Sequence, residues 1–215
     1  MVKIYSIEGL IGSGKSTFIQ KLKQSVDNPN IIFLQEPVTE WLMFNDSNGE
    51  NIIEKFYKDQ HAYAFTFQMM AYISRIAMLR QAIRKHPDAI LITERSVYAD
   101  KNVFASMLYA EGKMTDIEFK IYTKWFDEFI LELPLSGIIY LDVPVDIAHQ
   151  RIQIRNRTGE DDIPVEYLQQ CKDYHDKWIH NSLLSTLVVD YSADFSSDDF
   201  DITHFTENVL SFILK

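Results

Sequence analysis

The sequence has little cysteine, little positive charge and no long hydrophobic run. Cys171 is the only cysteine in 215 residues, which excludes an intramolecular disulfide and a metal cluster held by cysteines. The 21 Lys and Arg residues are outnumbered by 31 Asp and Glu residues, for a net charge of -10. This balance argues against nucleic acid or an anionic membrane as the main partner. No apolar run approaches the ~20 residues of a membrane span.

Proline and glycine are also scarce, and no linker rich in them divides the chain. We therefore expect residues 1–215 to form one domain, because this length supports a full hydrophobic core. The first apolar run begins almost at once, which leaves no room for a signal or transit peptide. Together with the scarcity of cysteine, this favours a cytoplasmic protein.

Short apolar runs alternate with longer helical patterns along the chain. Two helical patterns cover residues 61–85 and 115–133, and the short runs lie at residues 3–7, 31–34, 89–93, 138–141 and 187–189. Strands that are covered on both faces are continuously apolar, and parallel strands need crossover connections. The alternation predicts a three-layer α/β fold with a five-stranded parallel sheet flanked by helices.

Charged residues follow each of the expected strands. In chain order they are Glu8, Glu36, Glu94 with Arg95, Asp142 and Asp190. Ligands of open parallel sheets bind at the carboxyl ends of the strands. We therefore expect these side chains to cluster in space.

A glycine-rich loop lies between the first expected strand and a helical pattern. Its sequence, EGLIGSGKST, has the spacing G-x-x-x-x-G-K-[ST], in which backbone N–H groups wrap the phosphates of a nucleoside triphosphate. Lys15 can reach the terminal phosphates, and the Ser16 hydroxyl can bind Mg²⁺. The predicted phosphate-binding residues are Gly9, Leu10, Ile11, Gly12, Ser13, Gly14, Lys15, Ser16 and Thr17. The Asn-Lys-x-Asp motif that a GTPase switch needs is absent.

Three residues at the strand ends suit phosphoryl transfer. Glu36 can take a proton from a hydroxyl nucleophile, although a lone Glu is more often a helix cap or an ion-pair partner. Glu94 can share a Mg²⁺ ion with Ser16, and Arg95 can stabilise charge on the transferred phosphoryl group.

A cluster of arginines lies later in the chain. Arg151, Arg155 and Arg157 fall within seven residues, which favours a lid over about residues 151–162 that closes on a triphosphate. The alternative is a solvated helix face that pairs with the acidic residues 160–162. The acidic segment 190–201 is by itself typical of a solvated loop.

These motifs together resemble the deoxynucleoside kinases of the deoxycytidine/deoxyguanosine kinase family. The segments EGLIGSGKST, EPV..W, FTFQ......R, TERSVY.D..VFA, R...R.R and IPVEYL occur in the family's order over nearly the whole chain. The resemblance implies a P-loop kinase fold and Mg²⁺-dependent transfer of the γ-phosphate of ATP, or of another NTP, to the 5′-hydroxyl of a 2′-deoxynucleoside. It also implies a role in nucleotide salvage and a homodimer formed through helices.

The resemblance further implies a role for each matching residue. Glu36 is the general base and Arg95 lies beside the 5′-hydroxyl, while Lys15 and the three arginines hold the donor. Trp41, Phe67 and Phe104 enclose the base, Tyr57 and Glu160 bind the 3′-hydroxyl, and Asp194 and Phe195 contact the donor's own base.

Four further residues are expected to select the base. Gln68, Ala71 and Arg75 share one helix face by their spacing, and Arg75 can pair with Asp100. An Asp acceptor suits the amine of cytosine or adenine and repels the thymine carbonyl. The four residues resemble those of the deoxycytidine kinase branch, which favours deoxycytidine or purine deoxynucleosides over thymidine.

Two other functions remain open from the sequence. A nucleoside monophosphate kinase, such as a thymidylate kinase, shares the fold and a Glu-Pro pair, but its acceptor phosphate needs cations. Between Pro37 and His61 only Lys55 and Lys58 are cationic. The third possibility is a non-catalytic nucleotide-binding protein.

Overall fold

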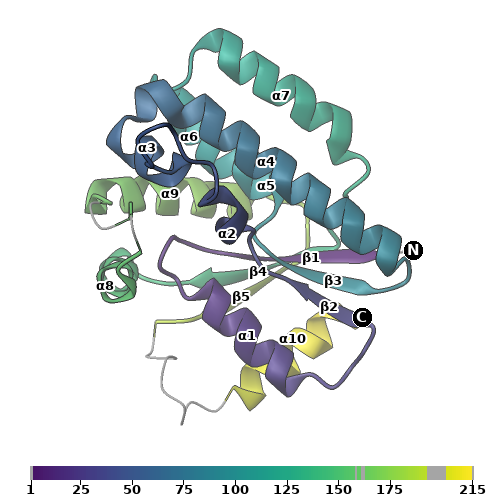
Figure 1. Ribbon diagram of the computed structural model, residues 1–215. Coiled ribbons are helices and arrows are strands. Elements are labelled where there is room, and N and C mark those ends of the chain that lie inside the picture. Colours follow the sequence, from purple (N-terminus) through teal and green to yellow (C-terminus); the bar gives the residue numbers. More distant parts are fainter. Residues whose placement is uncertain (1, 158, 161–162, 193–201, 215) are drawn as a thin grey trace.

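The computed structural model describes residues 2–157, 159–160, 163–192 and 202–214 (Figure 1). Its sheet contains β1 (Lys3–Glu8), β2 (Ile31–Leu34), β3 (Ile90–Glu94), β4 (Gly137–Asp142) and β5 (Thr186–Asp190). The strands are parallel, in the order β2-β3-β1-β4-β5. This confirms the predicted sheet, and each strand begins and ends within one residue of its expected bounds.

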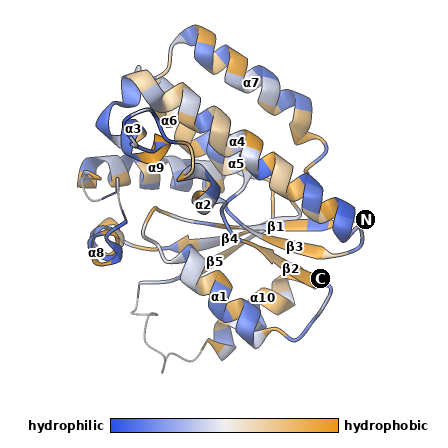
Figure 2. Ribbon diagram, viewed as in Figure 1, coloured by the Kyte–Doolittle hydropathy of each residue, from blue (hydrophilic) through white to orange (hydrophobic). Residues whose placement is uncertain are grey.

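Helices cover both faces of the sheet, as predicted (Figure 1). α1 (Lys15–Ser25) and α10 (Thr203–Ile213) lie on one face, and α4 (Gln60–Lys85) and α9 (Val165–Asn181) lie on the other, with α7 (Asp116–Ile130) outside α4. The strands are the most continuously hydrophobic elements (Figure 2), because alternate residues pack into two different cores. Ile7 packs with Phe18 of α1 on one face, and Ile4 packs with Leu79 of α4 on the other.

Further helices, most of them short, connect these elements. They are α2 (Val38–Trp41), α3 (Ile52–Lys58), α5 (Val97–Ala99), the π-helix η1 (Asp100–Ala105), α6 (Ser106–Ala110) and α8 (Val145–Arg155). Asn51 and Glu54 form a capping box at the start of α3, and Thr115 and Glu118 form another at α7. These caps satisfy the first N–H groups of each helix and so fix where it begins.

One property of the helices bears on membranes. Among the described residues, no helix combines the length and the apolar character that crossing a membrane requires.

Candidate functional site

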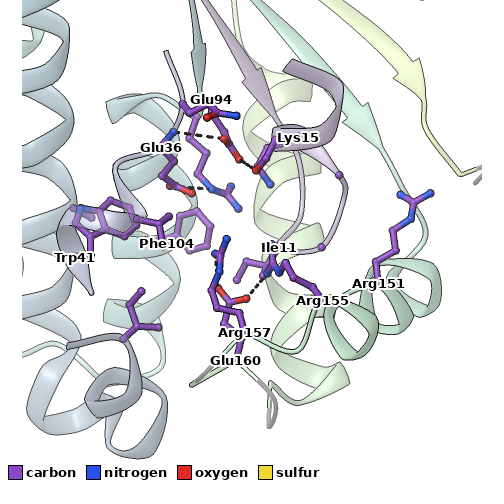
Figure 3. Close-up of a pocket in the computed structure, with 18 of the residues that line it drawn as sticks. Ile11, Lys15, Glu36, Trp41, Glu94, Phe104, Arg151, Arg155, Arg157 and Glu160 are labelled. Carbon is purple, nitrogen blue, oxygen red and sulfur yellow. Dashed lines mark hydrogen bonds and ion pairs between the residues drawn. The ribbon is translucent and has the colours of Figure 1, made fainter. Parts of the chain in front are cut away.

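A cavity of about 820 Å³ opens at the carboxyl ends of the strands (Figure 3). Most of the predicted site residues line it: Ile11, Gly12, Gly14, Lys15, Ser16, Thr17, Glu36, Trp41, Tyr57, Phe67, Gln68, Ala71, Arg75, Glu94, Arg95, Asp100, Phe104, Arg151, Arg155, Arg157 and Glu160. Gly9, Leu10 and Ser13 of the glycine-rich loop are not among the lining residues. Asp194 and Phe195 lie outside the described residues.

The glycine-rich loop leads directly into α1. Gly14 precedes the helix with a φ of +88°, a conformation that glycine adopts without strain. The Lys15 ammonium donates to the carbonyl of Leu10 at 2.6 Å and to that of Gly9 at 3.3 Å. Burial and the nearby Arg95 lower the pKa of Lys15 to about 7. In this conformation the lysine is held inside the loop that would surround a phosphate.

Ser16 and Glu94 meet across the cavity floor. The Ser16 hydroxyl donates to Glu94 Oε1 at 2.6 Å. A hydroxyl and a carboxylate are oxygen donors that suit Mg²⁺, which takes its other ligands from water and substrate phosphates. Among the described residues there is no group of three or more His, Cys, Asp or Glu side chains that could hold a metal by themselves. The donor set therefore fits a metal that arrives with the nucleotide.

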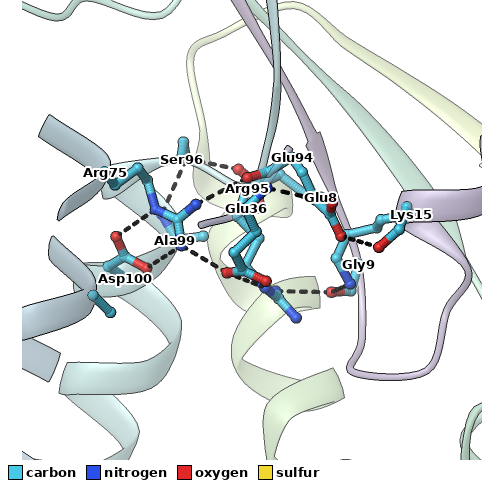
Figure 4. Close-up of polar contacts among 12 residues, drawn as sticks. Glu8, Gly9, Lys15, Glu36, Arg75, Glu94, Arg95, Ser96, Ala99 and Asp100 are labelled. Atoms are coloured by element: carbon cyan, nitrogen blue, oxygen red, sulfur yellow. Dashed lines mark hydrogen bonds and ion pairs between the residues drawn. The ribbon is translucent and has the colours of Figure 1, made fainter. Parts of the chain in front are cut away.

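Arg75 joins Asp100, which was predicted to help select the base, to Glu36 (Figure 4). Its Nε donates to Asp100 at 2.9 Å, which is the predicted ion pair. Its other nitrogens donate to the Glu94 carbonyl at 2.9 Å and to Glu36 Oε1 at 2.7 Å, two contacts that the sequence did not predict. Arg75 is fully buried, so its charge is compensated by these acceptors rather than by water.

The two carboxylates beside Arg75 have opposite pKa shifts. Burial raises the pKa of Glu36, but Arg75 and Arg95 outweigh burial and bring the pKa below its ordinary value. Burial also raises the pKa of Asp100. There burial outweighs the opposing effect of Arg75, so the pKa lies above its ordinary value. Glu36 is thus a carboxylate at neutral pH and able to accept a proton.

Arg95 lies between Glu36 and the glycine-rich loop. Its Nη1 donates to the Gly9 carbonyl at 3.0 Å, and its Nε is 3.6 Å from Glu36 Oε1. The guanidinium also lies over the Phe104 ring, 4.8 Å from the ring centre. This position brings a fixed positive charge to the boundary between the two ends of the cavity.

Aromatic side chains enclose the other end of the cavity. The rings of Trp41 and Phe67 pack edge to face, with their centres 5.7 Å apart, and the Trp41 indole N–H donates to the Ser74 hydroxyl at 2.8 Å. Phe56 and Tyr167 also line the cavity, and sequence reasoning missed both. No signal distinguished Phe56, because a lone aromatic residue in a helical pattern is usually a core residue. Tyr167 lies in the IPVEYL segment that carries the resemblance, and this segment could have pointed to it.

The three arginines of the expected lid divide into two groups (Figure 3). Arg155 and Arg157 both pair with Glu160, and the Arg157 pair is 3.1 Å long. Arg151 instead donates to the carbonyls of Ser13 and Tyr191, at 3.2 and 3.1 Å. The acid pairing that was the alternative prediction is therefore present, while all three arginines also line the cavity.

The expectation that all the strand-end charges gather was wrong for β4 and β5. Asp142 pairs with Lys172 of α9 at 3.0 Å, and Asp190 accepts from Ser192. Neither is among the lining residues of the cavity. The nearby cation or hydroxyl satisfies each of these carboxylates locally. Of the carboxylates predicted at the strand ends, only Glu36 and Glu94, at the ends of β2 and β3, line the cavity.

The two lysines available for an acceptor phosphate are occupied elsewhere. Lys55 pairs with Asp46 at 2.5 Å, and Lys58 pairs with Glu50. Neither lysine lines the cavity. Residues 37–61 therefore supply no lysine or arginine to the cavity, although the phosphate of a nucleoside monophosphate would need such cations.

Comparisons with known proteins find relatives over almost the whole chain. Residues 5–214 match the family model described as deoxynucleoside kinase. A probable deoxycytidine kinase of fowlpox virus is 34% identical over 98% of this chain and 88% of its own length. Human deoxycytidine kinase is 34% identical over 90% of this chain and 85% of its own. A mitochondrial deoxyguanosine kinase of Xenopus laevis is 30% identical over 83% and 73%.

Proposed function

The chain belongs to the deoxynucleoside kinase family and is an ATP-dependent phosphotransferase, and from this premise we propose which of its residues carry the reaction. The acceptor is the 5′-hydroxyl of a 2′-deoxynucleoside, and the donor is the γ-phosphate of ATP or another NTP. The observation that carries the assignment is one cavity that contains both the glycine-rich loop and Glu36.

Glu36 is proposed as the general base. Its carboxylate is held in place by Arg75 and is ionised at neutral pH, so it can accept the proton of the 5′-hydroxyl as the oxygen attacks phosphorus. Arg95 lies close enough to Glu36 to stabilise charge on the phosphoryl group in transit. Lys15 and the backbone of the loop hold the donor phosphates. Most of the catalysis is then positioning and charge stabilisation.

Mg²⁺ is the proposed cofactor, with Ser16 and Glu94 as its protein ligands. When bound, the ion neutralises charge on the donor phosphates. The support is the 2.6 Å contact between the Ser16 hydroxyl and the Glu94 carboxylate. Loss of activity with a chelator and its recovery with Mg²⁺ would test the requirement.

The nucleoside is proposed to bind with its base among Trp41, Phe67 and Phe104 and its sugar at Tyr57 and Glu160. Gln68 and Asp100 face the base edge, and Ala71 leaves room for the ring. Because Asp100 accepts hydrogen bonds from Arg75, it suits an amino-bearing base. Deoxycytidine or purine deoxynucleosides are therefore the proposed substrates, in nucleotide salvage, rather than thymidine.

The whole chain is proposed to act as one catalytic domain with a lid at about residues 151–162. We also propose that it forms a homodimer and acts in the cytoplasm, where ATP is supplied. Exposed apolar side chains on α7, among them Ile117 and Trp125, support the dimer.

One competition assay tests the proposed function. The four deoxynucleosides are offered with ATP and Mg²⁺, and kcat/KM is measured for each, with dCMP and dTMP as monophosphate controls. We expect phosphorylation of deoxycytidine or a purine deoxynucleoside to exceed that of thymidine. Faster phosphorylation of a monophosphate, or nucleotide binding without turnover, would contradict the proposal.

A further inference from the structure

Arg95 has a backbone conformation that its surroundings must hold in place. Its φ is +59°, in the left-handed region, which is unfavourable for a residue with a side chain. The sharp turn that results lets Glu94 reach Ser16 while Arg95 reaches Gly9. The geometry of the site thus depends on a strained turn directly after β3.

Hydrogen bonds from buried groups hold this turn on both sides. The Arg95 N–H donates to the Ile7 carbonyl at 3.0 Å, and the Thr93 hydroxyl donates to the Arg95 carbonyl at 2.6 Å. The next residue, Ser96, donates its hydroxyl to Glu8 Oε1 at 2.6 Å. Ser96 Oγ also accepts from the Ala99 N–H and so caps α5.

Glu8 is an unusual residue to find at this position. It is the last residue of β1 and is fully buried, and its Oε2 has no hydrogen-bond partner among the described residues. Burial raises the pKa of its carboxyl to about 7. A buried carboxyl is costly where an apolar side chain would pack, yet the proposed mechanism gives Glu8 no chemical task.

Two hydrogen bonds connect the chain around Glu8 to the turn at Arg95 (Figure 4). The Glu8 side chain accepts from Ser96, and the carbonyl of the next residue, Gly9, accepts from Arg95 Nη1 at 3.0 Å. The same Gly9 carbonyl accepts from Lys15. The end of β1 therefore connects Arg95, at the boundary between the two ends of the cavity, to Lys15 of the glycine-rich loop.

We propose that Glu8 is a positioning residue, which acts through Ser96 to fix the left-handed turn and so places the Arg95 guanidinium against the glycine-rich loop. This inference rests on the proposed function, because the placement matters only if Arg95 faces the transferred phosphoryl group. A residue of this kind affects turnover more than nucleoside binding.

Two substitutions of Glu8 separate its hydrogen bond from its packing. Glu8→Gln keeps an acceptor oxygen for Ser96, and Glu8→Met keeps the length of the side chain without an acceptor. With the best deoxynucleoside and ATP, we expect Glu8→Met to lower kcat about 10- to 100-fold, with nucleoside KM changed less than about threefold. Glu8→Gln should stay within about twofold of wild-type kcat.

A double-mutant cycle with Arg95→Ala tests whether the effect passes through Arg95. In that background we expect Glu8→Met to lower the residual kcat by less than about twofold, because the group that it positions is gone. An equal loss in both backgrounds overturns the proposal, as does an equal loss in Glu8→Gln and Glu8→Met.

Further variants keep the test decisive. If Glu8→Met does not fold, Ser96→Ala removes the same bond and enters the same cycle. Thr115→Ala removes the cap of α7, away from the cavity, and controls for the lost cap of α5. Turnover by the wild type is measured first, and its absence would refute the proposed function. A loss of kcat from Glu8→Met that is equal in the wild-type and Arg95→Ala backgrounds refutes only the role of Glu8.

Discussion

At the scale of single residues, two guanidinium groups determine the charge state of Glu36 in the cavity. Arg75 contacts Asp100, Glu36 and the Glu94 carbonyl at once, and Arg95 adds a second charge near Glu36. Their combined effect is a pKa of Glu36 below its ordinary value despite burial. The proposed base is therefore ionised across the neutral range, and a proton that it takes up in one turnover is readily released to solvent before the next.

Glu36→Gln tests this assignment. The amide keeps an oxygen for Arg75 but cannot take up a proton, so we expect kcat to fall about 10²- to 10⁴-fold, as for loss of a general base. Steady-state kinetics with deoxycytidine and ATP measure it. Glu40→Gln, an exposed neighbour on α2, is the matched control and should leave kcat unchanged. Turnover of Glu36→Gln close to that of the wild type would remove Glu36 from the role of base.

Arg75→Met combined with Asp100→Ala tests base selection. Removing both members of the pair leaves neither of its buried charges unpaired and removes the acceptor that repels the thymine carbonyl. Glu36 loses Arg75 and keeps Arg95 as a nearby cation, an effect that both nucleosides share. We expect the ratio of thymidine to deoxycytidine kcat/KM to rise by about tenfold or more. Asp100→Ala alone leaves Arg75 on Glu36 and serves as the comparison. A ratio that does not rise shows that the account of base selection is wrong.

The Arg75–Asp100 pair was predictable from the sequence, but the contact of Arg75 with Glu36 was not. The pair follows from helix spacing and from the position of Asp100 just after Arg95. The second contact depends on β2 and β3 lying side by side in register, with Leu34 opposite Thr93, which brings Glu36 beside the end of β3. The left-handed conformation of Arg95 was also unpredictable, since it depends on a hydrogen bond to the Ile7 carbonyl, which lies far away in the sequence.

At the scale of elements, the strands were predictable because burial on both faces leaves a continuous apolar run. The short helices α2, α5 and η1 were not, since three to six residues are too few to show a helical period. These helices nevertheless position the site. The π-helix η1 carries Asp100 and Phe104, both of which line the cavity.

The segment proposed as a lid contacts α3 through a glycine, which allows a test at this scale. Gly159 has a φ of +86°, and a Cβ there would lie 3.1 Å from backbone atoms of Glu54. Gly159→Ala should therefore displace Arg157 and Glu160 and raise KM for both substrates several-fold. Gly49→Ala has the same φ of +86° with open space around it, so it reproduces the strain alone. Equal KM values in the two variants would show that the packing on α3 does not position the lid.

At the scale of the whole molecule, Glu8 makes stability depend on pH. Its pKa is raised by burial from 4.5 to about 7 in the folded chain, so the folded state holds the proton more tightly. The stability from this group is full below about pH 4.5 and is lost as the pH rises through about 7. We expect the free energy of unfolding of Glu8→Gln, relative to the wild type, to increase by about 3 kcal/mol between pH 4.5 and 7.5. Urea unfolding at several pH values measures it, and a constant difference would contradict the raised pKa.

The proposed dimer also belongs to this scale. Ile117, Ile121 and Trp125 are exposed on α7 at spacings of four residues, so they form a stripe along one face of the helix. The buried side of α7 is already fixed to α4, where the Tyr72 hydroxyl donates to the Trp125 carbonyl at 2.8 Å. The stripe therefore remains outside the core of the monomer, as an interface between copies would require.

Trp125→Glu places a charge in the middle of this stripe, and we expect it to convert a dimer into a monomer in sedimentation velocity experiments. Ile117, Ile121 and Trp125 are not among the residues that line the cavity, so the monomer should keep kcat per chain within about twofold of the wild type. Leu183→Glu changes a fully exposed apolar residue outside the stripe and should leave the dimer intact. A wild-type chain that sediments as a monomer would refute the dimer. Dissociation by both variants would show instead that added negative charge, on a chain whose net charge is already -10, separates the copies.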